Sequence, residues 1–167
     1  MTAAGTTTLR AYLAAPYAAR DRMREYAEDL VRIGLDVTAS WLDEEHEISP
    51  GTTGAALALD SAEVARHAAT DLDDIARCDV LVLFTAGVLG FDPAEVASGG
   101  RHVETGYALA KGIPVIVVGE PENVFHRLDH AGPDGATGCS WVQVCGSWLE
   151  AVGELKLRLD AAKAWSA

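Results

Sequence analysis

The segment Asp79-Val80-Leu81-Val82-Leu83-Phe84 decides the fold, because five apolar residues in succession leave the strand no polar face. A strand that is apolar on both sides is typical of a parallel sheet with helices on both of its faces. A second run of this kind lies further along the chain, separated from the first by a loop and a helical stretch: Ile113-Pro114-Val115-Ile116-Val117-Val118. The two runs predict central strands of an α/β domain.

Short apolar runs alternate with amphipathic stretches along the rest of the chain, and Met23, Tyr26 and Leu30 recur at helical spacing. Further strands are predicted at 9–15, 36–41 and 141–144, with helices at 18–33, 60–77, 102–111, 120–129 and 147–165. We therefore expect one domain, residues 1–167, with a flavodoxin-like, doubly wound sheet of five parallel strands in a three-layer sandwich.

The composition limits the partners of the protein. With 25 acidic and 13 basic side chains, the formal net charge is −12, and a surface this acidic repels phosphate backbones and anionic lipids. No apolar run approaches the roughly 20 residues of a membrane span, and no signal-peptide core precedes Leu9. The three cysteines lack CxxC spacing, which favours a reducing compartment. We expect a cytoplasmic protein that binds a small molecule, not polymeric nucleic acid or a membrane.

The topology predicts where a ligand binds. In doubly wound sheets, ligands lie outside the carboxyl ends of the strands. In this chain those ends are the loop around Pro16, the long loops 42–59 and 85–100, and residues 119–123. Pro16 is therefore a substrate-binding candidate, and so is Trp41, which ends the second predicted strand. Trp41 is expected either to stack on a nucleobase or to pack in the core or a lid.

The most informative segment is SGGRHVETGYA, residues 98–108, which joins a long loop to a helix. Gly100 lets the backbone approach a ligand closely, and a helix N-terminus favours anions. Glu104 is expected in the first helical turn, where a carboxylate is held ionised and suits a nucleophile. The alternative is that Glu104 is only an N-terminal helix charge. His102 is expected either to hydrogen-bond a phosphate or base of the substrate, or to have a structural role.

A second carboxylate cluster precedes the first central strand. Asp71 and Asp74 are three residues apart, so they share one face of the predicted helix, whereas Asp73 is interpreted as a solvated charge. Cleavage of a glycosidic bond requires two carboxylates, one as nucleophile and one for acid/base work or ligand orientation.

These residues resemble the nucleoside 2-deoxyribosyltransferase family, including the related nucleoside 5′-monophosphate N-glycosidases. The resemblance spans residues 9 to about 130. It rests on four pieces in the same order: Tyr12-Leu13-Ala14-Ala15-Pro16-Tyr17, Asp71-Leu72, GGRHVETGYALAKG at 99–112, and PVIVVG at 114–119 followed by Glu122-Asn123-Val124-Phe125-His126.

The resemblance implies that Glu104 attacks C1′ of the sugar and forms a covalent glycosyl-enzyme intermediate. Another base or water then takes the sugar. Tyr12 would orient the Glu104 carboxylate, and Asp71 would contact the base or sugar and serve in proton transfer. The family's sites are completed by a neighbouring subunit, so the resemblance implies a homo-oligomer. Asn123 and His126 lie where the residues contributed to the neighbouring subunit's site would come from.

One position separates two branches of this family. Six residues before the nucleophile, the deoxyribosyltransferases carry Asp, which binds a free 5′-hydroxyl, and the monophosphate N-glycosidases carry Ser, which binds the 5′-phosphate. This chain has Ser98, and Arg101 would add a positive charge. The alternative is that Ser98 is an ordinary loop residue, so exchange and hydrolysis both stay open.

No metal or cofactor is expected. His46, His67 and His130 show no metal-ligand spacing, and the segment AAPYAAR at 14–20 is a poor phosphate-binding loop for a flavin. The main alternative to an enzyme is a non-catalytic module that binds or senses a nucleotide on the same fold. The co-occurrence of Tyr12, Asp71 and Glu104 favours the enzyme.

Overall fold

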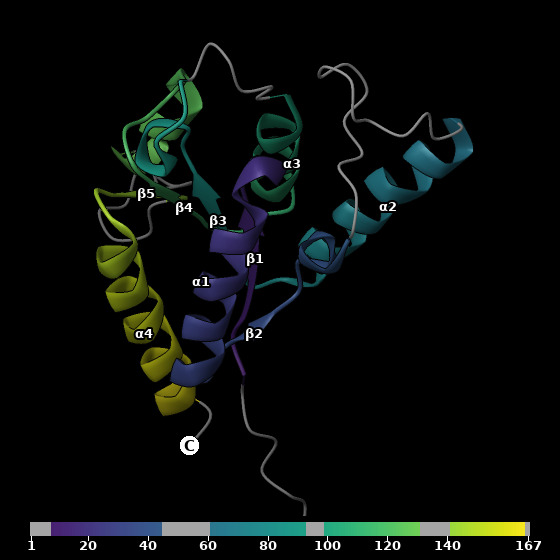
Figure 1. Ribbon diagram of the computed structural model, residues 1–167. Helices are drawn as coiled ribbons and strands as arrows, with labels where there is room; N and C mark the ends of the chain where they lie inside the picture. The colour runs from purple at the N-terminus through teal and green to yellow at the C-terminus, as the bar shows by residue number, and fades with distance from the viewer. Residues whose placement is uncertain (1–7, 45–60, 93–98, 131–140, 166–167) are drawn as a thin grey trace, which may run out of the picture.

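The computed structural model describes residues 8–44, 61–92, 99–130 and 141–165. Five parallel strands form one sheet in the order β2-β1-β3-β4-β5 (Figure 1). This is the order of flavodoxin-like sheets, so the predicted fold class is confirmed. The strands are β1 (Arg10–Ala14), β2 (Asp36–Val37), β3 (Val80–Phe84), β4 (Val115–Val118) and β5 (Val142–Cys145).

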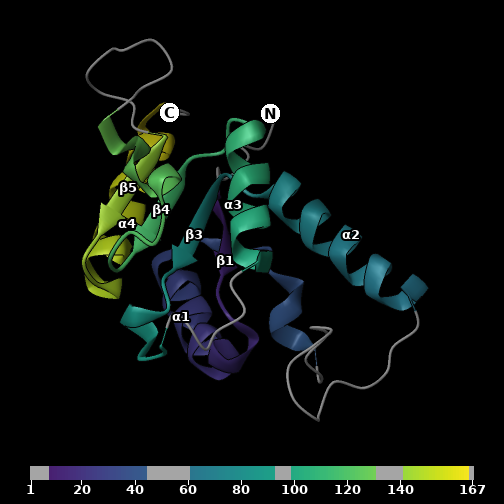
Figure 2. The same ribbon diagram turned by 90° about the horizontal axis from the view of Figure 1, so that it is seen from above.

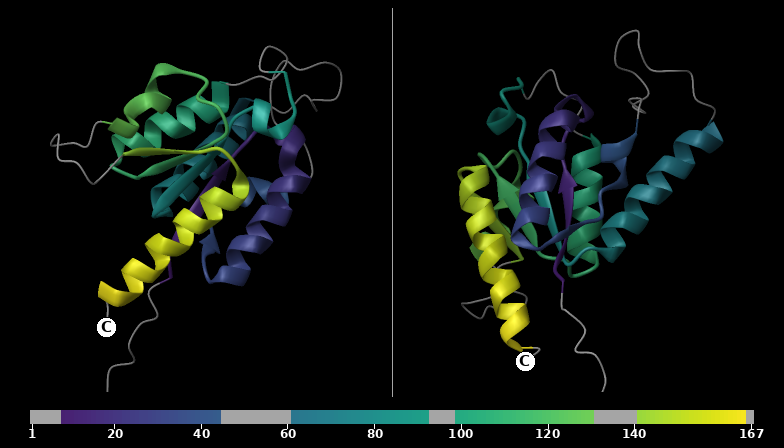
Figure 3. Two further views of the ribbon diagram at one scale, coloured as in Figure 1. Left: turned by 90° about the vertical axis from the view of Figure 1, so that its left-hand side faces the viewer. Right: turned by 60° about the horizontal axis from the view of Figure 1, so that its bottom comes forward.

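Four α-helices cover the sheet in two layers, as Figures 1 and 3 show. Helices α1 (Arg20–Ile33) and α4 (Trp148–Trp165) lie on one face, and α2 (Ser61–Arg77) and α3 (Gly99–Ala110) lie on the other. Viewed from above, α2 extends away from the sheet beside α3 (Figure 2). Four short 3₁₀ helices connect these elements: η1 (Tyr17–Ala19), η2 (Ser40–Asp43), η3 (Gly87–Leu89) and η4 (Val124–His130).

The core lies between the sheet and the helices, and β3 is buried at every position. This agrees with its unbroken apolar sequence. On the α1–α4 side, Trp148 stacks on Tyr26 with ring centroids 4.5 Å apart, and Tyr26 stacks on Phe84 at 5.5 Å. These three rings join two helices to the central strand. In the described part of the chain, no helix is long and apolar enough to cross a membrane.

Three predicted boundaries are wrong. The helix expected at 120–129 begins only at Val124 and is the 3₁₀ helix η4. The other two changes move functional residues. The second strand was expected at 36–41, but β2 ends at Val37 and η2 follows, because the carboxylate of Asp74 accepts hydrogen bonds from the backbone N–H (2.8 Å) and the hydroxyl (2.6 Å) of Ser40. The helix expected from His102 begins at Gly99. Most of the two long loops, residues 45–60 and 93–98, and the turn-rich stretch 131–140 lie outside the described residues.

Candidate active site

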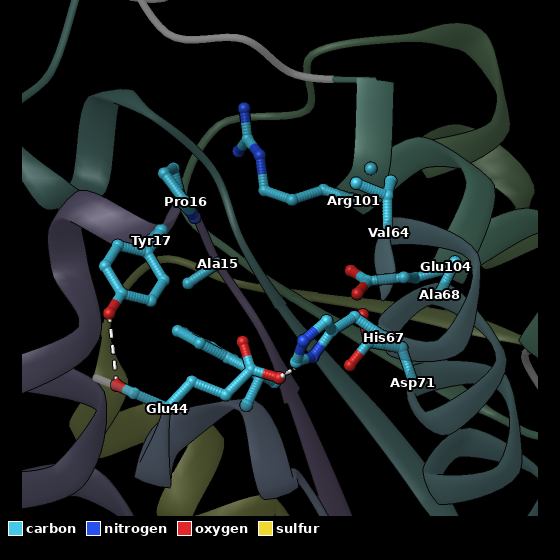
Figure 4. Close-up of a pocket in the computed structure, with 12 residues that line it drawn as sticks. Ala15, Pro16, Tyr17, Glu44, Val64, His67, Ala68, Asp71, Arg101 and Glu104 are labelled. Carbon is cyan, nitrogen blue, oxygen red and sulfur yellow. Dashed lines mark hydrogen bonds and ion pairs between the residues drawn. The ribbon is translucent and has the colours of Figure 1, made fainter. Parts of the chain in front are cut away.

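A pocket of about 230 Å³ opens at the carboxyl ends of β1 and β2, between α2 and α3 (Figure 4). This is the edge of the sheet at which the topology predicts a ligand. One face of α2 forms one wall, since its contributing residues recur at intervals of three and four. The lining residues are Ala15, Pro16, Tyr17, Trp41, Glu44, Val64, His67, Ala68, Asp71, Gly100, Arg101 and Glu104.

Tyr12 and Glu104 meet at the inner end of this pocket. The Tyr12 hydroxyl donates a hydrogen bond to Oε1 of Glu104 at 2.8 Å, across 92 positions of sequence. Tyr12 is fully buried on β1, where it pairs with Leu81 of β3. Burial, together with the negative charges of Glu104 and Asp71, raises the pKa of Tyr12 well above 10, so the phenol stays protonated and remains a donor.

The pKa of Glu104 corrects one expectation. Because α3 begins at Gly99, Glu104 lies in the second turn, and the first turn holds no acidic residue. The pKa of Glu104 is raised to about 7, chiefly by burial and also by the negative charge of Asp71, while the Tyr12 hydrogen bond and Arg101 oppose the shift. The helix start therefore does not hold this carboxylate fully ionised. Glu104 instead gains and loses its proton near neutral pH, and the Tyr12 hydroxyl is positioned to stabilise the ionised form.

Asp71 stands beside this pair on α2. Burial raises the pKa of Asp71 to about 6, aided by the negative charges of Glu44 and Asp74 and opposed by His67 and by the nearby Tyr12 hydroxyl. The two carboxyl groups that the sequence singled out, Asp71 and Glu104, therefore line the same pocket. Two carboxyls with raised pKa values in one pocket can exchange protons with a ligand near neutral pH.

His67 and Glu44 form a hydrogen-bonded pair on the pocket wall. Nδ1 of His67 lies 2.7 Å from Oε1 of Glu44 (Figure 4). The backbone of Glu44 is fixed as well, because its carbonyl accepts hydrogen bonds from Arg20 and from the Tyr17 hydroxyl. In the sequence, His67 stood out only as a possible metal ligand, and nothing in the pattern paired it with Glu44. The two residues come from different elements 23 positions apart, and no local spacing links them.

Arg101 occupies the pocket wall on the α3 side and is only 3% exposed. Its Nη1 donates to the carbonyl of Phe84 at 2.8 Å and lies 3.4 Å from Oε2 of Glu122. Its Nε is buried and has no hydrogen-bond partner in the described part of the chain. Figure 4 shows the guanidinium on the opposite side of the pocket from Glu44. The site thus has a cationic end and an acidic end.

Other predicted site residues are distributed unevenly. Pro16, Trp41 and Gly100 line the pocket, and Trp41 is also anchored in the core, where its indole N–H donates to the carbonyl of Leu13 at 2.9 Å. Trp41 is 8% exposed, so core packing accounts for most of its surface. Ser98 lies outside the described residues.

His102, Asn123 and His126 do not line this pocket but form a cluster beyond it. The Asn123 amide nitrogen lies 3.0 Å from Nε2 of His126 and 3.3 Å from Nδ1 of His102. Its oxygen accepts the N–H of Phe125 and so caps η4. His126 is fully buried, and burial, reinforced by His102, lowers its pKa. In the single chain, this cluster fixes the segment after β4 and does not contact the pocket.

The pocket residues that sequence reasoning missed are Tyr17, His67 and the small side chains around them. Glu44, together with Asp43 and Glu45, was expected either to contact a base edge or to belong to a solvated loop, and the structure places Glu44 in the pocket lining. A helical-face pattern starting from Asp71 would have found His67 and Val64, because they precede it by four and seven positions. Within the described ranges, no three His, Cys, Asp or Glu side chains are arranged to hold a metal ion.

Comparison with known proteins adds to this picture. No family model and no curated protein matches the chain. Among solved structures, the CMP N-glycosidase BcmB of Clostridium botulinum matches with a TM-score of 0.50 at 21% identity, over 89% of this chain and 98% of that one. A 2-deoxyribosyltransferase from Bacillus psychrosaccharolyticus matches with a TM-score of 0.53 at 17% identity, over 86% and 90% of the two chains. The chain has the fold of these two enzymes.

A conserved protein from Enterococcus faecalis V583 has the same fold, with a TM-score of 0.55 at 19% identity over 91% of this chain and 99% of that one. The resemblance to the deoxyribosyltransferase and N-glycosidase family that the motifs indicated is thus matched by the fold. The three matches cover 86% to 91% of this chain, so the shared fold extends over most of its length.

Proposed function

We propose that the protein cleaves the N-glycosidic bond of a nucleoside or nucleoside 5′-monophosphate through a covalent glycosyl intermediate on Glu104. The sugar then passes to another base, as in a deoxyribosyltransferase, or to water, as in an N-glycosidase. The observation that carries the proposal is the contact of Tyr12 with Glu104, at 2.8 Å, in a pocket that also holds Asp71.

The chemistry divides one difficult displacement into two easier ones. In the first step, Oε of ionised Glu104 bonds to C1′ as the bond from C1′ to the base nitrogen breaks. In the second step, water or a second base attacks C1′, and the Glu104 carboxylate leaves. Two displacements on one carbon retain its configuration. Tyr12 orients the carboxylate, while Asp71 contacts the base or sugar and takes part in proton transfer.

The fold likeness supports this proposal, because one of the similar structures is a CMP N-glycosidase and another is a 2-deoxyribosyltransferase. Arg101 favours an anionic substituent at its end of the pocket, since its Nε is buried without a described partner. Together with Ser98, Arg101 is proposed to bind a 5′-phosphate, and Gly100, which lines the pocket with open space beside it, leaves room for that group.

The deciding experiment is an exchange-against-hydrolysis assay. The wild type is incubated with 2′-deoxynucleosides, with and without a second free base, and with the corresponding 5′-monophosphates, and released bases are separated by chromatography. Base exchange without phosphate identifies a transferase, and free base from monophosphates alone identifies a hydrolase. Binding with no base release identifies a nucleotide-binding module instead. Full activity in Glu104→Ala contradicts both enzymatic forms.

We also propose a homo-oligomer whose sites are completed across subunits. Three apolar side chains on α3 and η4 support it, because Val103, Val124 and Phe125 are 66%, 76% and 62% exposed. Phe125 also lines a cavity together with Leu109 and Leu128. An exposed apolar patch of this kind marks an interaction surface. Light scattering should give a multiple of the 17.6 kDa chain mass, and Phe125→Asp should lower it toward the monomer.

A further inference from the structure

The Glu44–His67 pair has no role in the chemistry described so far. His67 contributes to the pocket from the same helical face as Asp71, one turn earlier on α2. Glu44 approaches it from the end of η2, on the other side of the pocket wall. Both side chains are partly buried, with 29% of His67 and 22% of Glu44 exposed.

The hydrogen bond between them fixes the imidazole. An ionised carboxylate only accepts hydrogen bonds, so Nδ1 of His67 carries the proton at this 2.7 Å contact. Nε2 lies on the opposite edge of the ring, directed away from Glu44. A carboxylate that holds one imidazole nitrogen in this way sets the orientation of the ring and compensates its positive charge when both nitrogens are protonated.

The contacts divide the pocket into a sugar end and a base end. Because C1′ must lie against Glu104, the sugar occupies the region where Tyr12 and Asp71 approach that carboxylate. The base then extends along α2 away from Glu104, toward the wall formed by Val64, Ala68 and His67. The small side chains of Val64 and Ala68 leave room for a planar ring beside the imidazole.

We propose that His67 is a further catalytic residue, which donates a proton from Nε2 to the departing nucleobase, and that Glu44 is its positioning residue. This inference rests on the proposed function. The step starts with both ring nitrogens of His67 protonated. As the bond from C1′ to the base nitrogen breaks, its electron pair goes to the base, the Nε2 proton neutralises the base and leaves a neutral imidazole, and Glu104 bonds to C1′. When water or a second base attacks C1′, its proton returns to Nε2 and the carboxylate is released.

The test compares two leaving groups in one enzyme. The first substrate is the nucleoside or monophosphate that the wild type cleaves best. The second carries an activated base that needs no proton to depart, which is 7-methylguanine for a purine enzyme or 5-nitrouracil for a pyrimidine enzyme. In His67→Gln, kcat/KM on the ordinary base should fall by about 100-fold or more. On the activated base, the loss should stay below about 10-fold, because general-acid catalysis no longer contributes there.

Two further variants make the result specific. Glu44→Gln keeps the size of the side chain but removes its charge, and it should show the same selective loss in smaller measure. Arg66→Gln, next to His67 but outside the pocket lining, should leave both rates unchanged. Thermal melting of each variant checks that the fold is intact, and Glu44→Gln reports on the pair if His67→Gln is unstable.

Equal losses on both substrates in His67→Gln would overturn the inference. So would a selective loss in Asp71→Asn that is absent from His67→Gln, because Asp71 would then be the donor. If the wild type releases neither base, the proposed function itself is contradicted. This outcome differs from a failure of the His67 inference because it appears before any residue is changed.

Discussion

Asp71 and Asp74 lie three residues apart on α2, yet their carboxylates lie in different surroundings. Asp71 faces the pocket, whereas Asp74 is fully buried and accepts two hydrogen bonds from Ser40 as well as an ion pair with Arg77. Asp74 thereby holds η2, the segment that presents Trp41 and Glu44 to the pocket. One carboxylate is placed for chemistry and its neighbour supports the wall of the site.

Replacement of Asp74 is expected to cost stability. Asp74→Ala removes a fully buried carboxylate and the two hydrogen bonds that it accepts from Ser40, which should lower the free energy of unfolding by about 1.5–3 kcal/mol. Urea denaturation followed by circular dichroism measures this difference. Asp73→Ala, an exposed change on the same helix, is the control and should stay within about 0.5 kcal/mol of the wild type. Similar stability for both variants would contradict the role of Asp74.

Activity should depend on pH through Glu104. In the proposed reaction the carboxylate must be ionised to attack C1′, and its pKa is about 7, so kcat/KM should rise with pH between 5 and 7. The measured midpoint belongs to the coupled set of Glu104 and Asp71. Tyr12→Phe removes the hydrogen bond that lowers the pKa of Glu104, so the midpoint should move to higher pH. A profile that is flat from pH 5 to 8 would refute this prediction.

The same pKa predicts a stability change in the opposite direction. Glu104 binds its proton more tightly in the folded chain, about 7 against an ordinary 4.5, so its ionisation opposes folding as pH rises through this window. Glu104→Gln removes that cost. Relative to the wild type, the variant should gain up to about 3 kcal/mol of stability at pH 8 and little at pH 4.5. Melting temperatures at the two pH values provide the comparison, and Asp73→Asn should show no such dependence.

Gly119, at the end of β4, is expected to tolerate no side chain. Its φ of +105° lies in the left-handed region, and a Cβ would fall 2.2 Å from Oγ1 of Thr85 and 2.8 Å from Cβ of Val88. Gly119→Ala should therefore destabilise the protein by about 2 kcal/mol or more. Gly153→Ala is a matched control, because Gly153 lies within α4 with open space around it and should gain about 0.5–1 kcal/mol. Denaturant midpoints of the two variants should thus move in opposite directions.

Much of the framework follows from local sequence. The predicted strands at 9–15, 80–84, 113–118 and 141–144 match β1, β3, β4 and β5 within a few residues, and the helices at 18–33, 60–77 and 147–165 match α1, α2 and α4. Apolar runs and helical periodicity are patterns among neighbouring residues. The sequence alone therefore shows which segments can form buried strands and amphipathic helices. β2 was overestimated because its termination depends on Asp74, which lies 34 positions from Ser40.

The sequence by itself determined the order of strands and helices along the chain, the edge of the sheet where the pocket opens, and the motif residues Tyr12, Asp71 and Glu104. Only the tertiary structure decided how those residues act on one another: the Tyr12–Glu104 hydrogen bond, the raised pKa of Glu104 and the Glu44–His67 pair. The physical reason is that burial and electrostatics depend on distances in space. Those distances are set by packing between segments that lie tens of residues apart, and no local pattern records them.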